Sequence, residues 1–420
     1  MTLTALDARL MWVEVLLQLA SLFVPMRLWP DLLCFFLLLL TIIFCLNGIL
    51  SLFFFPSLRP VESSPFPVPR EHIQQNHDCT SPCVSVLVPA RNEEQRLPSC
   101  LQSLSKQTVS NIEILVLDDN SEDGTAGIVR DFAKKDSRVQ LLVGSTLPQQ
   151  WVGKNWACHQ LAQQARAQVL LFTDADTVHH PQALRLALEF LQKTHADMLS
   201  VWPRQVTKTW SEWLVIPLVY LLILVFRPQW LERLRGFSVL GAANGQFILI
   251  RRSAYDRIGG HFAVASHLVE DVALSRRVRG MHLLSLNVDG SQVVQCRMYE
   301  NFPELWEGFT KNLRALFDNN STAFVLFGIV VFAVSVLPFF LLPLLMVCGQ
   351  TVAACFCAAQ CCLMWGIRTV LAIRFRHPPI SVLLHPFGQL LVLIIAVNSW
   401  WQLSRGTVSW KGRHYSQGSI

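Results

Sequence analysis

Long runs of apolar residues lie near both ends of the chain. Residues 31–55 contain no charged side chain after Asp31. At about 1.5 Å per helical residue, they are long enough to cross a hydrocarbon core of about 30 Å. Three further apolar runs, interrupted by prolines, follow at 323–347, 351–373 and 379–402. The pattern predicts one transmembrane helix near the amino terminus and three near the carboxyl terminus.

The segments that flank the first apolar run differ from it in composition. Residues 10–24 are apolar but contain Glu14 and Gln18, which favours a helix at the membrane interface. We therefore expect residues 1–55 to hold an interfacial segment followed by one transmembrane helix. Residues 56–82 are rich in proline and polar side chains and are expected to be a linker. The first run is too long and too far from the start to be a signal peptide.

Between these ends, residues 83–320 alternate short apolar runs with segments of helical character. The apolar runs have the length of strands and lie at 84–88, 112–118, 139–143, 168–174 and 196–202. The helical segments lie at 93–106, 124–135, 153–166 and 181–193. This alternation predicts an α/β domain with a mostly parallel sheet, whose ligands bind at the carboxyl ends of the strands.

The composition agrees with a membrane protein that carries a soluble domain. Hydrophobic residues make up 52% of the chain, charged residues only 15%, and the mean hydropathy is +0.38. The net charge of +6 is expected to come from lysine and arginine beside the membrane helices, so we predict no nucleic-acid partner. The twelve cysteines show no zinc-finger spacing and are interpreted as small buried hydrophobic residues.

Polar side chains follow four successive predicted strands. The first strand ends in PARNEE, the second in LDDNSEDGT, the third leads to a Gly-Lys pair that enters a helix, and the fourth ends in DAD. The predicted nucleotide-binding residues are Pro89, Arg91, Glu93, Asp118, Asp119, Lys154 and Asp174. Asp174 and Asp176 would hold a divalent cation. Taken alone, these two acids fit a turn or a helix cap equally well, but four polar strand ends at one sheet edge favour a nucleotide site.

The sequence contains neither GxxxxGK[ST] nor GxGxxG, so an ATPase or a dinucleotide dehydrogenase would lack its phosphate-binding element. The order and spacing of PARNEE, LDDNSEDGT and DAD instead resemble the inverting glycosyltransferases of family two, which have the GT-A fold. Further segments resemble the membrane-bound branch that glycosylates carotenoids, with hopanoid-associated and ceramide glycosyltransferases as relatives. They are NGQFILI (244–250), VEDVALSRRV (269–278), RMYENFPELWEGFTKN (297–312) and WKGRHY (410–415). The resemblance covers residues 84–415.

The resemblance implies a separate role for each group of charged residues at the strand ends. Arg91 and Glu93 would flank the nucleobase and Asp119, with Asp118, would contact the base or its ribose. Asp174 and Asp176 would hold Mg²⁺ or Mn²⁺ against the diphosphate, and a UDP-sugar is expected rather than a GDP-sugar.

Asp271 of the Glu270-Asp271 pair would be the general base that takes the proton of an acceptor hydroxyl, with no covalent sugar-enzyme step. Without the resemblance, this pair would be interpreted as first-turn acids of a helix that runs to Arg279.

The chain departs from the processive relatives and from ceramide glucosyltransferases in one motif. It has no Q/RxxRW sequence after the predicted base, which counts against polymer synthesis and favours transfer of a single sugar. The residues that we expect to contact acceptor or diphosphate instead are Asn244, Gly245, Gln246, Arg297, Trp306, Lys311 and Asn312. The aromatic-rich segment around Trp306 also fits a membrane-interface anchor.

One apolar segment inside the α/β domain constrains the topology. The apolar centre of residues 210–235, Trp213–Phe226, is short for a membrane crossing. A crossing would also place Asp176 and Asp271 on opposite sides of the membrane, so we expect an amphipathic interfacial segment here. Residues 321–403 would then hold the three carboxyl-terminal helices.

The basic tail, residues 404–420, raises a second question of topology. Three crossings before it would place this tail on the side away from the catalytic domain. Either the tail is not catalytic or one segment is re-entrant, with the break at His385–Gly388.

These observations predict a multi-pass protein of the cell membrane, with its catalytic domain facing the cytoplasm. It would transfer one sugar from a nucleotide sugar to a hydroxyl of a lipid, a carotenoid in the first instance. A hopanoid, a sphingolipid or a polyprenyl phosphate is the alternative acceptor. The non-enzymatic alternative is an inactive scaffold that binds nucleotide sugar.

Overall fold

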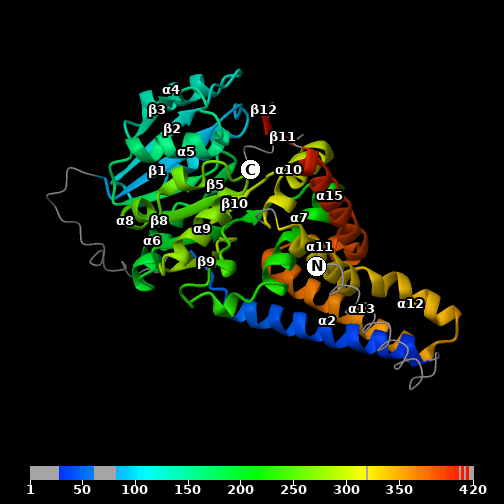
Figure 1. Ribbon diagram of the computed structural model, residues 1–420. Coiled ribbons are helices and arrows are strands. Elements are labelled where there is room, and N and C mark those ends of the chain that lie inside the picture. The colour runs from blue at the N-terminus through cyan, green and yellow to red at the C-terminus, as the bar shows by residue number, and fades with distance from the viewer. Residues whose placement is uncertain (1–27, 61–81, 318–319, 406–407, 411–412, 416–420) are drawn as a thin grey trace, which may run out of the picture.

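The computed structural model describes residues 28–60, 82–317, 320–405, 408–410 and 413–415. It places an α/β domain beside a group of long helices, which extend away from one edge of the sheet (Figure 1). The interfacial helix predicted at 10–24 and most of the predicted linker lie outside the described residues.

The α/β domain is built on a seven-stranded sheet in the order β3-β2-β1-β4-β8-β6-β9. Its strands are β1 (Val84–Ala90), β2 (Ile112–Asp118), β3 (Val139–Val143), β4 (Val169–Thr173), β6 (Met198–Trp202), β8 (Phe247–Arg251) and β9 (Ser285–Asp289). All strand pairs are parallel except those made by β8, which is antiparallel to β4 and β6. The fold class predicted from the sequence is therefore confirmed.

Helices cover both faces of this sheet. One face packs against α3 (Leu97–Ser105), α4 (Thr125–Lys135) and α6 (Ala183–Lys193). The other face packs against α5 (Gly153–Gln164), α8 (Arg252–Arg257), the 3₁₀ helix η4 (Gly260–Val264) and α9 (Glu270–Gly280). Strand β2 is buried along its whole length, as a strand between two helical layers must be. A small sheet, β5 (Thr177–His179), β10 (Val294–Cys296) and β7 (Arg204–Gln205), adjoins the carboxyl edge.

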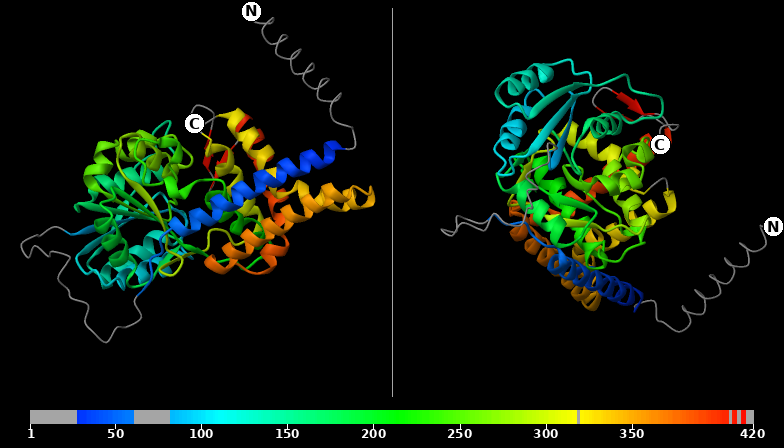
Figure 2. Two further views of the ribbon diagram at one scale, coloured as in Figure 1. Left: turned by 90° about the horizontal axis from the view of Figure 1, so that it is seen from below. Right: turned by 90° about the vertical axis from the view of Figure 1, so that its left-hand side faces the viewer.

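Three described helices are long and apolar enough to cross a membrane: α2 (Trp29–Phe54), α13 (Thr351–Phe375) and α15 (His385–Arg405). A fourth candidate is the pair α11 (Ser321–Ser335) and α12 (Leu337–Val347), whose axes are bent by 47°. Helices α2, α12 and α13 extend together away from the sheet, whereas α15 lies against α10 (Phe302–Ala315) (Figures 1 and 2). These helices are consistent with membrane association.

The apolar segment inside the α/β domain is helix α7 (Trp210–Val225), and its environment differs from the predicted interfacial one. Ten of its sixteen residues are buried, because α2, α10, α13 and α15 all pack against it. The physical reason is that α7 is apolar on every face, and such a helix is stable only when it is enclosed. Apart from Trp210 at the start of α7, the exposed large apolar residues of this region, Trp230 and Phe237 among them, lie beyond the helix.

An ion pair joins the long helices to the sheet. Arg374 at the end of α13 lies 3.0 Å from the carboxylate of Asp289, the last residue of β9. The same guanidinium donates to the carbonyl oxygen of Phe55, just after α2, and Ser57 Oγ donates to Asp289 at 2.7 Å. Residues 56–58 thus dock on the sheet, although we predicted them to belong to the linker.

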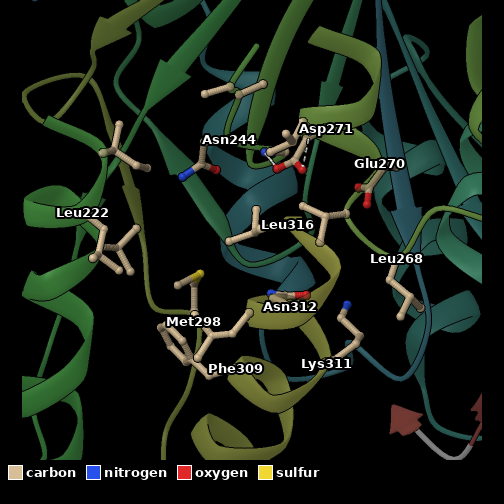
Figure 3. A pocket seen from close by; sticks show the side chains of 18 of the residues that line it. Leu222, Asn244, Leu268, Glu270, Asp271, Met298, Phe309, Lys311, Asn312 and Leu316 are labelled. Carbon is tan, nitrogen blue, oxygen red and sulfur yellow. Dashed lines mark hydrogen bonds between the residues drawn. The ribbon is translucent and has the colours of Figure 1, made fainter. Parts of the chain in front are cut away.

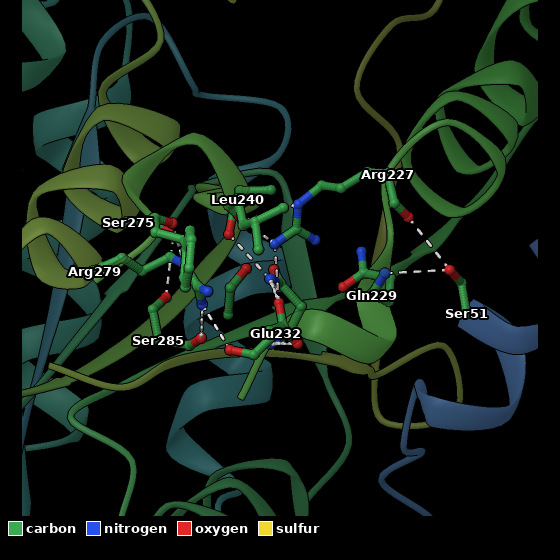
Figure 4. A network of polar contacts seen from close by, with 12 residues as sticks. Ser51, Arg227, Gln229, Glu232, Leu240, Ser275, Arg279 and Ser285 are labelled. Carbon is green, nitrogen blue, oxygen red and sulfur yellow. Dashed lines mark hydrogen bonds and ion pairs between the residues drawn. The ribbon is translucent and has the colours of Figure 1, made fainter. Parts of the chain in front are cut away.

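The segment between α7 and β8 is held by a buried polar network (Figure 4). It contains the 3₁₀ helices η2 (Gln229–Leu231) and η3 (Ser238–Leu240). Arg279 is almost fully buried and donates to the carbonyl oxygens of Glu232, Leu234, Phe237 and Ser285. Arg227 donates to the carbonyl of Leu240, and Ser51 of α2 accepts from the Gln229 amide. This network fixes one wall of the cavity described below.

The basic tail forms a hairpin of β11 (Val408–Trp410) and β12 (Arg413–Tyr415), and β11 contacts α10. The tail therefore lies beside the α/β domain (Figure 1). A helix break occurs at Leu384, between α14 (Ile380–Leu383) and α15, one residue before the predicted His385–Gly388 break. Both features are compatible with a re-entrant segment, and the side of the membrane on which the tail lies stays a prediction.

Candidate active site

A cavity of about 2080 Å³ opens at the carboxyl edge of the sheet. Its polar part is lined by the predicted residues Pro89, Arg91, Glu93, Asp119, Lys154, Asp174, Asp176, Asn244, Gly245, Gln246, Glu270, Asp271, Lys311 and Asn312. Its other part lies among α7, α10, α11 and α15 and is apolar. Figure 3 shows Asp271 and Asn244 on one side of the space, with Leu222, Met298 and Phe309 opposite. Most of the residues singled out in the sequence therefore converge on one cavity.

The first two strand ends are tied together by Arg91. Its Nη1 donates to the carbonyl oxygens of Asp119 and Asn120, at 2.8 and 3.1 Å. Asp119 is buried and lines the cavity, whereas Asp118 does not line it and accepts a hydrogen bond from the Ser121 amide. Of the two neighbouring acids, the structure thus brings only Asp119 to the cavity wall.

The DAD turn carries a buried carboxylate in an unfavourable environment. Asp176 Oδ1 is buried and has no hydrogen-bond partner among the residues that the structure describes. Burial raises the pKa of Asp176 to about 7, helped by the negative charges of Asp174 and Glu93. The turn itself is held by Thr177 Oγ1, which donates to the Asp174 carbonyl at 2.7 Å. A bound cation would remove the electrostatic penalty on Asp176.

Lys154 lies at the centre of the acidic residues. The lysine is the second residue of α5, and its Nζ is 2.8 Å from Asp174 Oδ1 and 2.9 Å from Glu270 Oε1. Burial lowers the pKa of Lys154, but the two carboxylates outweigh burial and raise it well above its ordinary value. Lys154 likewise outweighs the effect of burial on Glu270, whose pKa is lowered. We expected Lys154 to bind the nucleotide. It also links Asp174, at the end of the fourth strand, to Glu270, the neighbour of the predicted general base.

Asp271 is placed by backbone amides. Gly245 N–H donates to Asp271 Oδ2 and Val272 N–H to Oδ1, both at 2.7 Å. Burial raises the pKa of Asp271 to about 7, with a further contribution from the charge of Glu270. A carboxylate with a pKa near neutrality, held at the wall of a cavity, is suited to act as a general base.

Gly245 is required by the close approach of three side chains. A Cβ atom at this position would lie 3.1 Å from Lys154 Nζ, 3.3 Å from Asp271 Oδ2 and 3.4 Å from Glu270 Oε1. The glycine reaches the site because β8 is antiparallel to β4. Phe247, at the start of β8, pairs with Thr173, at the end of β4, so residues 244–246 fall beside the DAD turn.

The neighbours of Gly245 are held by hydrogen bonds to one another and to three residues distant in the sequence. Asn244 Oδ1 accepts from the Gln246 amide at 2.9 Å, and the Asn244 amide donates to Ser200 Oγ at 2.7 Å. The side chain of Gln246 is buried and bonds to Gln205 and Cys296. These bonds hold the turn that presents the Gly245 amide to Asp271.

Helix α10 brings two of the seven predicted acceptor or diphosphate contacts to the cavity. Lys311 and Asn312 line it (Figure 3). Arg297, just before α10, does not; its Nε lies 3.0 Å from Glu212 Oε1 in the first turn of α7. Trp306 does not line the cavity either and packs near Phe302, with ring centroids 5.7 Å apart. Neither residue lines the cavity, and their contact with acceptor or diphosphate stays a prediction.

Sequence reasoning missed Asn155. Its side chain is fully buried, and Nδ2 donates to the carbonyl oxygens of Val264, Ala265 and His267, at 2.8 to 3.0 Å. Asn155 follows Lys154, and the loop that it holds leads directly to Glu270. The only signal in the sequence was its place beside the lysine, because its partners lie far along the chain.

The acidic residues fit a divalent cation that is shared with a ligand. Among the described residues, no cluster of three or more His, Cys, Asp or Glu side chains is arranged to hold a metal ion. Asp174 and Asp176 supply two carboxylates, and Mg²⁺ is commonly bound by one or two carboxylates together with phosphate oxygens. The buried Asp176 Oδ1 atom, which has no hydrogen-bond partner among the described residues, is the observation that supports such an ion.

Comparisons with known proteins agree with this geometry. Residues 85–259 match the model of the family described as Glycosyl transferase family 2. A 4,4'-diaponeurosporenoate glycosyltransferase of Staphylococcus haemolyticus is 31% identical over 56% of this chain and 62% of its own length. The protein of the same name from Staphylococcus aureus strain USA300 is 28% identical over 79% of this chain and 88% of its own.

A solved mannosyltransferase structure has a similar fold. It is the mannosyltransferase PcManGT of Pyrobaculum calidifontis in complex with GDP-Man and Mn²⁺, with a TM-score of 0.53 and 15% identity. The superposition covers 89% of this chain and 99% of the mannosyltransferase. The fold is therefore that of the GT-A glycosyltransferases, and residues 85–259 match the glycosyl transferase family 2 model.

Proposed function

We propose that this protein is a membrane-bound, inverting, metal-dependent glycosyltransferase that transfers one sugar from a nucleotide sugar to a carotenoid-type lipid. The observation that carries the proposal is the continuity of the cavity. One space joins the acidic edge of the sheet, the predicted base Asp271 and an apolar region among long helices. The shared name of the two staphylococcal relatives supports a carotenoid-type acceptor.

The donor would lie along the carboxyl ends of the first strands. Arg91, Glu93 and Asp119 line that part of the cavity and would contact the nucleoside, for which we propose uridine. Asp174 and Asp176 would hold Mg²⁺ or Mn²⁺, which supplies positive charge to the departing diphosphate. Lys154 forms an ion pair with Asp174 and would add to that charge.

Asp271 would accept the proton of the acceptor hydroxyl while the hydroxyl oxygen attacks the anomeric carbon from the face opposite the diphosphate. The Gly245 and Val272 amides hold this carboxylate in place, and Lys154 keeps the adjacent Glu270 ionised. An acid acceptor, as the relatives' name denotes, would already be ionised at neutral pH and would not need this proton transfer. The activity of a variant without Asp271 therefore also shows whether the attacking oxygen of the acceptor belongs to a hydroxyl or to a carboxylate.

We further propose that the protein lies in the cell membrane with its catalytic domain in the cytoplasm, where nucleotide sugars are made. The apolar helices α2, α13 and α15, with the bent α11–α12 pair, support membrane insertion. The carboxyl edge of the sheet adjoins these helices, because β9 is anchored to α13. The acceptor would then reach Asp271 from the bilayer.

The test is the lipid and pigment profile of a strain from which the gene is deleted. The proposal predicts that one carotenoid glycoside disappears and that its unglycosylated precursor accumulates. Expression of the wild-type chain should restore the glycoside. Loss of a glycosylated hopanoid or sphingolipid instead would reassign the acceptor, and an unchanged lipid profile would favour a non-enzymatic scaffold.

A further inference from the structure

The apolar part of the cavity has a definite shape. Helix α11 lines it with Phe324, Phe327, Gly328 and Val331, a spacing that places all four on one helical face. Helix α15 lines the facing wall with a similar stripe that includes Val392 and Val397. Helix α7 lines the side opposite Asp271 with residues that include Leu222 (Figure 3). We call this space, bounded by α7, α11 and α15, the apolar wing.

The apolar wing opens to the outside between α11 and α15. Ile329 and Phe332 of α11 line the cavity and are also 57% and 42% exposed. Val397 and Trp400 of α15 line it and are 61% and 43% exposed. Residues that are both exposed and part of the lining mark the rim of an opening. In α11 and α15, which are described along their whole length, none of the lining side chains is charged.

Aromatic rings cluster along the wing. Phe327 of α11 has its ring centroid 5.5 Å from that of Phe226, which follows α7, and 5.5 Å from that of Phe317. All three line the cavity. Lys311 and Asn312 of α10 lie where the apolar lining meets the acidic residues (Figure 3). The wing therefore offers a long apolar surface that ends at polar groups beside Asp271.

We propose that the apolar wing binds the hydrocarbon chain of the acceptor and that the chain enters sideways from the bilayer between α11 and α15. This inference rests on the proposed function and specifies its substrate class as a lipid with a long unsaturated chain and a terminal oxygen. The chain would lie against the aromatic cluster, and the terminal oxygen would reach Asp271. Charged or bulky polar lipids would be excluded, because the rim offers them no partner.

Gly328 provides a direct test. A Cβ atom at this position would meet no heavy atom within 4 Å, and the residue lines the wing. The side chain of Gly328→Trp would therefore start from open space and occupy part of the wing. Gly366 of α13 is a matched control, because its Cβ would also meet nothing within 4 Å but it does not line the cavity. Both residues are glycines within apolar helices.

The full-length protein would be assayed in detergent with a UDP-sugar and Mn²⁺, using retinol as the long acceptor and crotyl alcohol as a short one. We expect Gly328→Trp to lower kcat/KM for retinol by about tenfold or more, since each lost methylene contact contributes a severalfold factor. The values for crotyl alcohol and the donor KM should stay at the wild-type level. Gly366→Trp should match the wild type with both acceptors.

Val397→Trp would narrow the opening between α11 and α15 from the side of α15. It tests the same inference if Gly328→Trp does not fold. The inference is overturned if the folded variants use retinol as well as the wild type does, or if they lose both acceptors equally. If the wild type transfers sugar to neither alcohol nor to any lipid, the proposed function fails instead.

Discussion

Replacing Asp271 with asparagine separates the catalytic role of this carboxylate from its cost to stability. The side chain keeps its shape and loses its charge. Raising the pKa of Asp271 from its ordinary 3.8 to about 7 corresponds to about 4 kcal/mol, at about 1.4 kcal/mol per tenfold change. The carboxylate is partly exposed, and the substitution removes one hydrogen bond from a backbone amide; both effects reduce this value. We therefore expect Asp271→Asn to raise the free energy of unfolding by about 1–2 kcal/mol.

The sign of the effect depends on pH. A carboxyl group whose pKa is raised on folding stabilises the folded state only while it is protonated, and this stability is lost as the pH rises through the folded pKa. Asp271→Asn should therefore be more stable than the wild type above pH 7 and should lose this advantage as the pH falls towards 3.8. Thermal midpoints measured without donor at about pH 8 and about pH 5 would show it. Transfer to a hydroxyl acceptor should fall by about a hundredfold or more.

Glu270→Gln is the control for this experiment, because the pKa of Glu270 is lowered in the folded protein, whereas that of Asp271 is raised. Lys154 lowers the pKa of Glu270, so the ionised form stabilises the fold and the substitution should lower the thermal midpoint at about pH 8. The reasoning on Asp271 is refuted if Asp271→Asn keeps more than about a tenth of the wild-type kcat/KM with a hydroxyl acceptor. It is also refuted if both variants shift the midpoint in the same direction.

Four further predictions concern the same site. Gly245→Ala should lower kcat by about tenfold in steady-state assays with little change in thermal midpoint, because its Cβ would press on Lys154 and Asp271. Asn155→Ala should destabilise the protein by about 1–3 kcal/mol in denaturant titrations, since three carbonyl oxygens lose their donor. Removing divalent metal with EDTA should abolish transfer, and Mn²⁺ or Mg²⁺ should restore it. The rate with a hydroxyl acceptor should fall as the pH drops below about 7, where Asp271 becomes protonated; a flat profile would contradict its role as base.

The sequence was sufficient to predict the parallel part of the fold. The apolar run at 112–118 coincides with β2, because a strand buried on both faces is a continuous apolar segment bounded by polar turns. The run at 139–143 coincides with β3, which lies at the edge of the sheet and is partly exposed. The antiparallel direction of β8 was not predicted, since an apolar run carries no information on strand direction. This direction is what brings Gly245 to the DAD turn.

The sequence predicted some parts of the candidate site and not others, because local patterns carry no information on how distant elements pack. The acids at strand ends converge because parallel strands end at one edge, and this could be inferred from their order alone. The pairing of Lys154 with both Asp174 and Glu270 depends on how α5 and α9 pack, which no local pattern encodes. The enclosure of α7 was missed because an apolar helix of its length has the same composition at a membrane surface and in a protein interior.

The central claim is that a nucleotide sugar and a polyene lipid meet in one cavity. The most direct measurement is the mass of the lipid recovered after the purified protein is incubated with a UDP-sugar, Mn²⁺ and a polyene alcohol or acid. The account predicts a product heavier than the lipid by one sugar residue, formed by the wild type and abolished when both Asp174 and Asp176 are replaced by asparagine. An unmodified lipid with the wild-type protein, or equal product with the double variant, would contradict it.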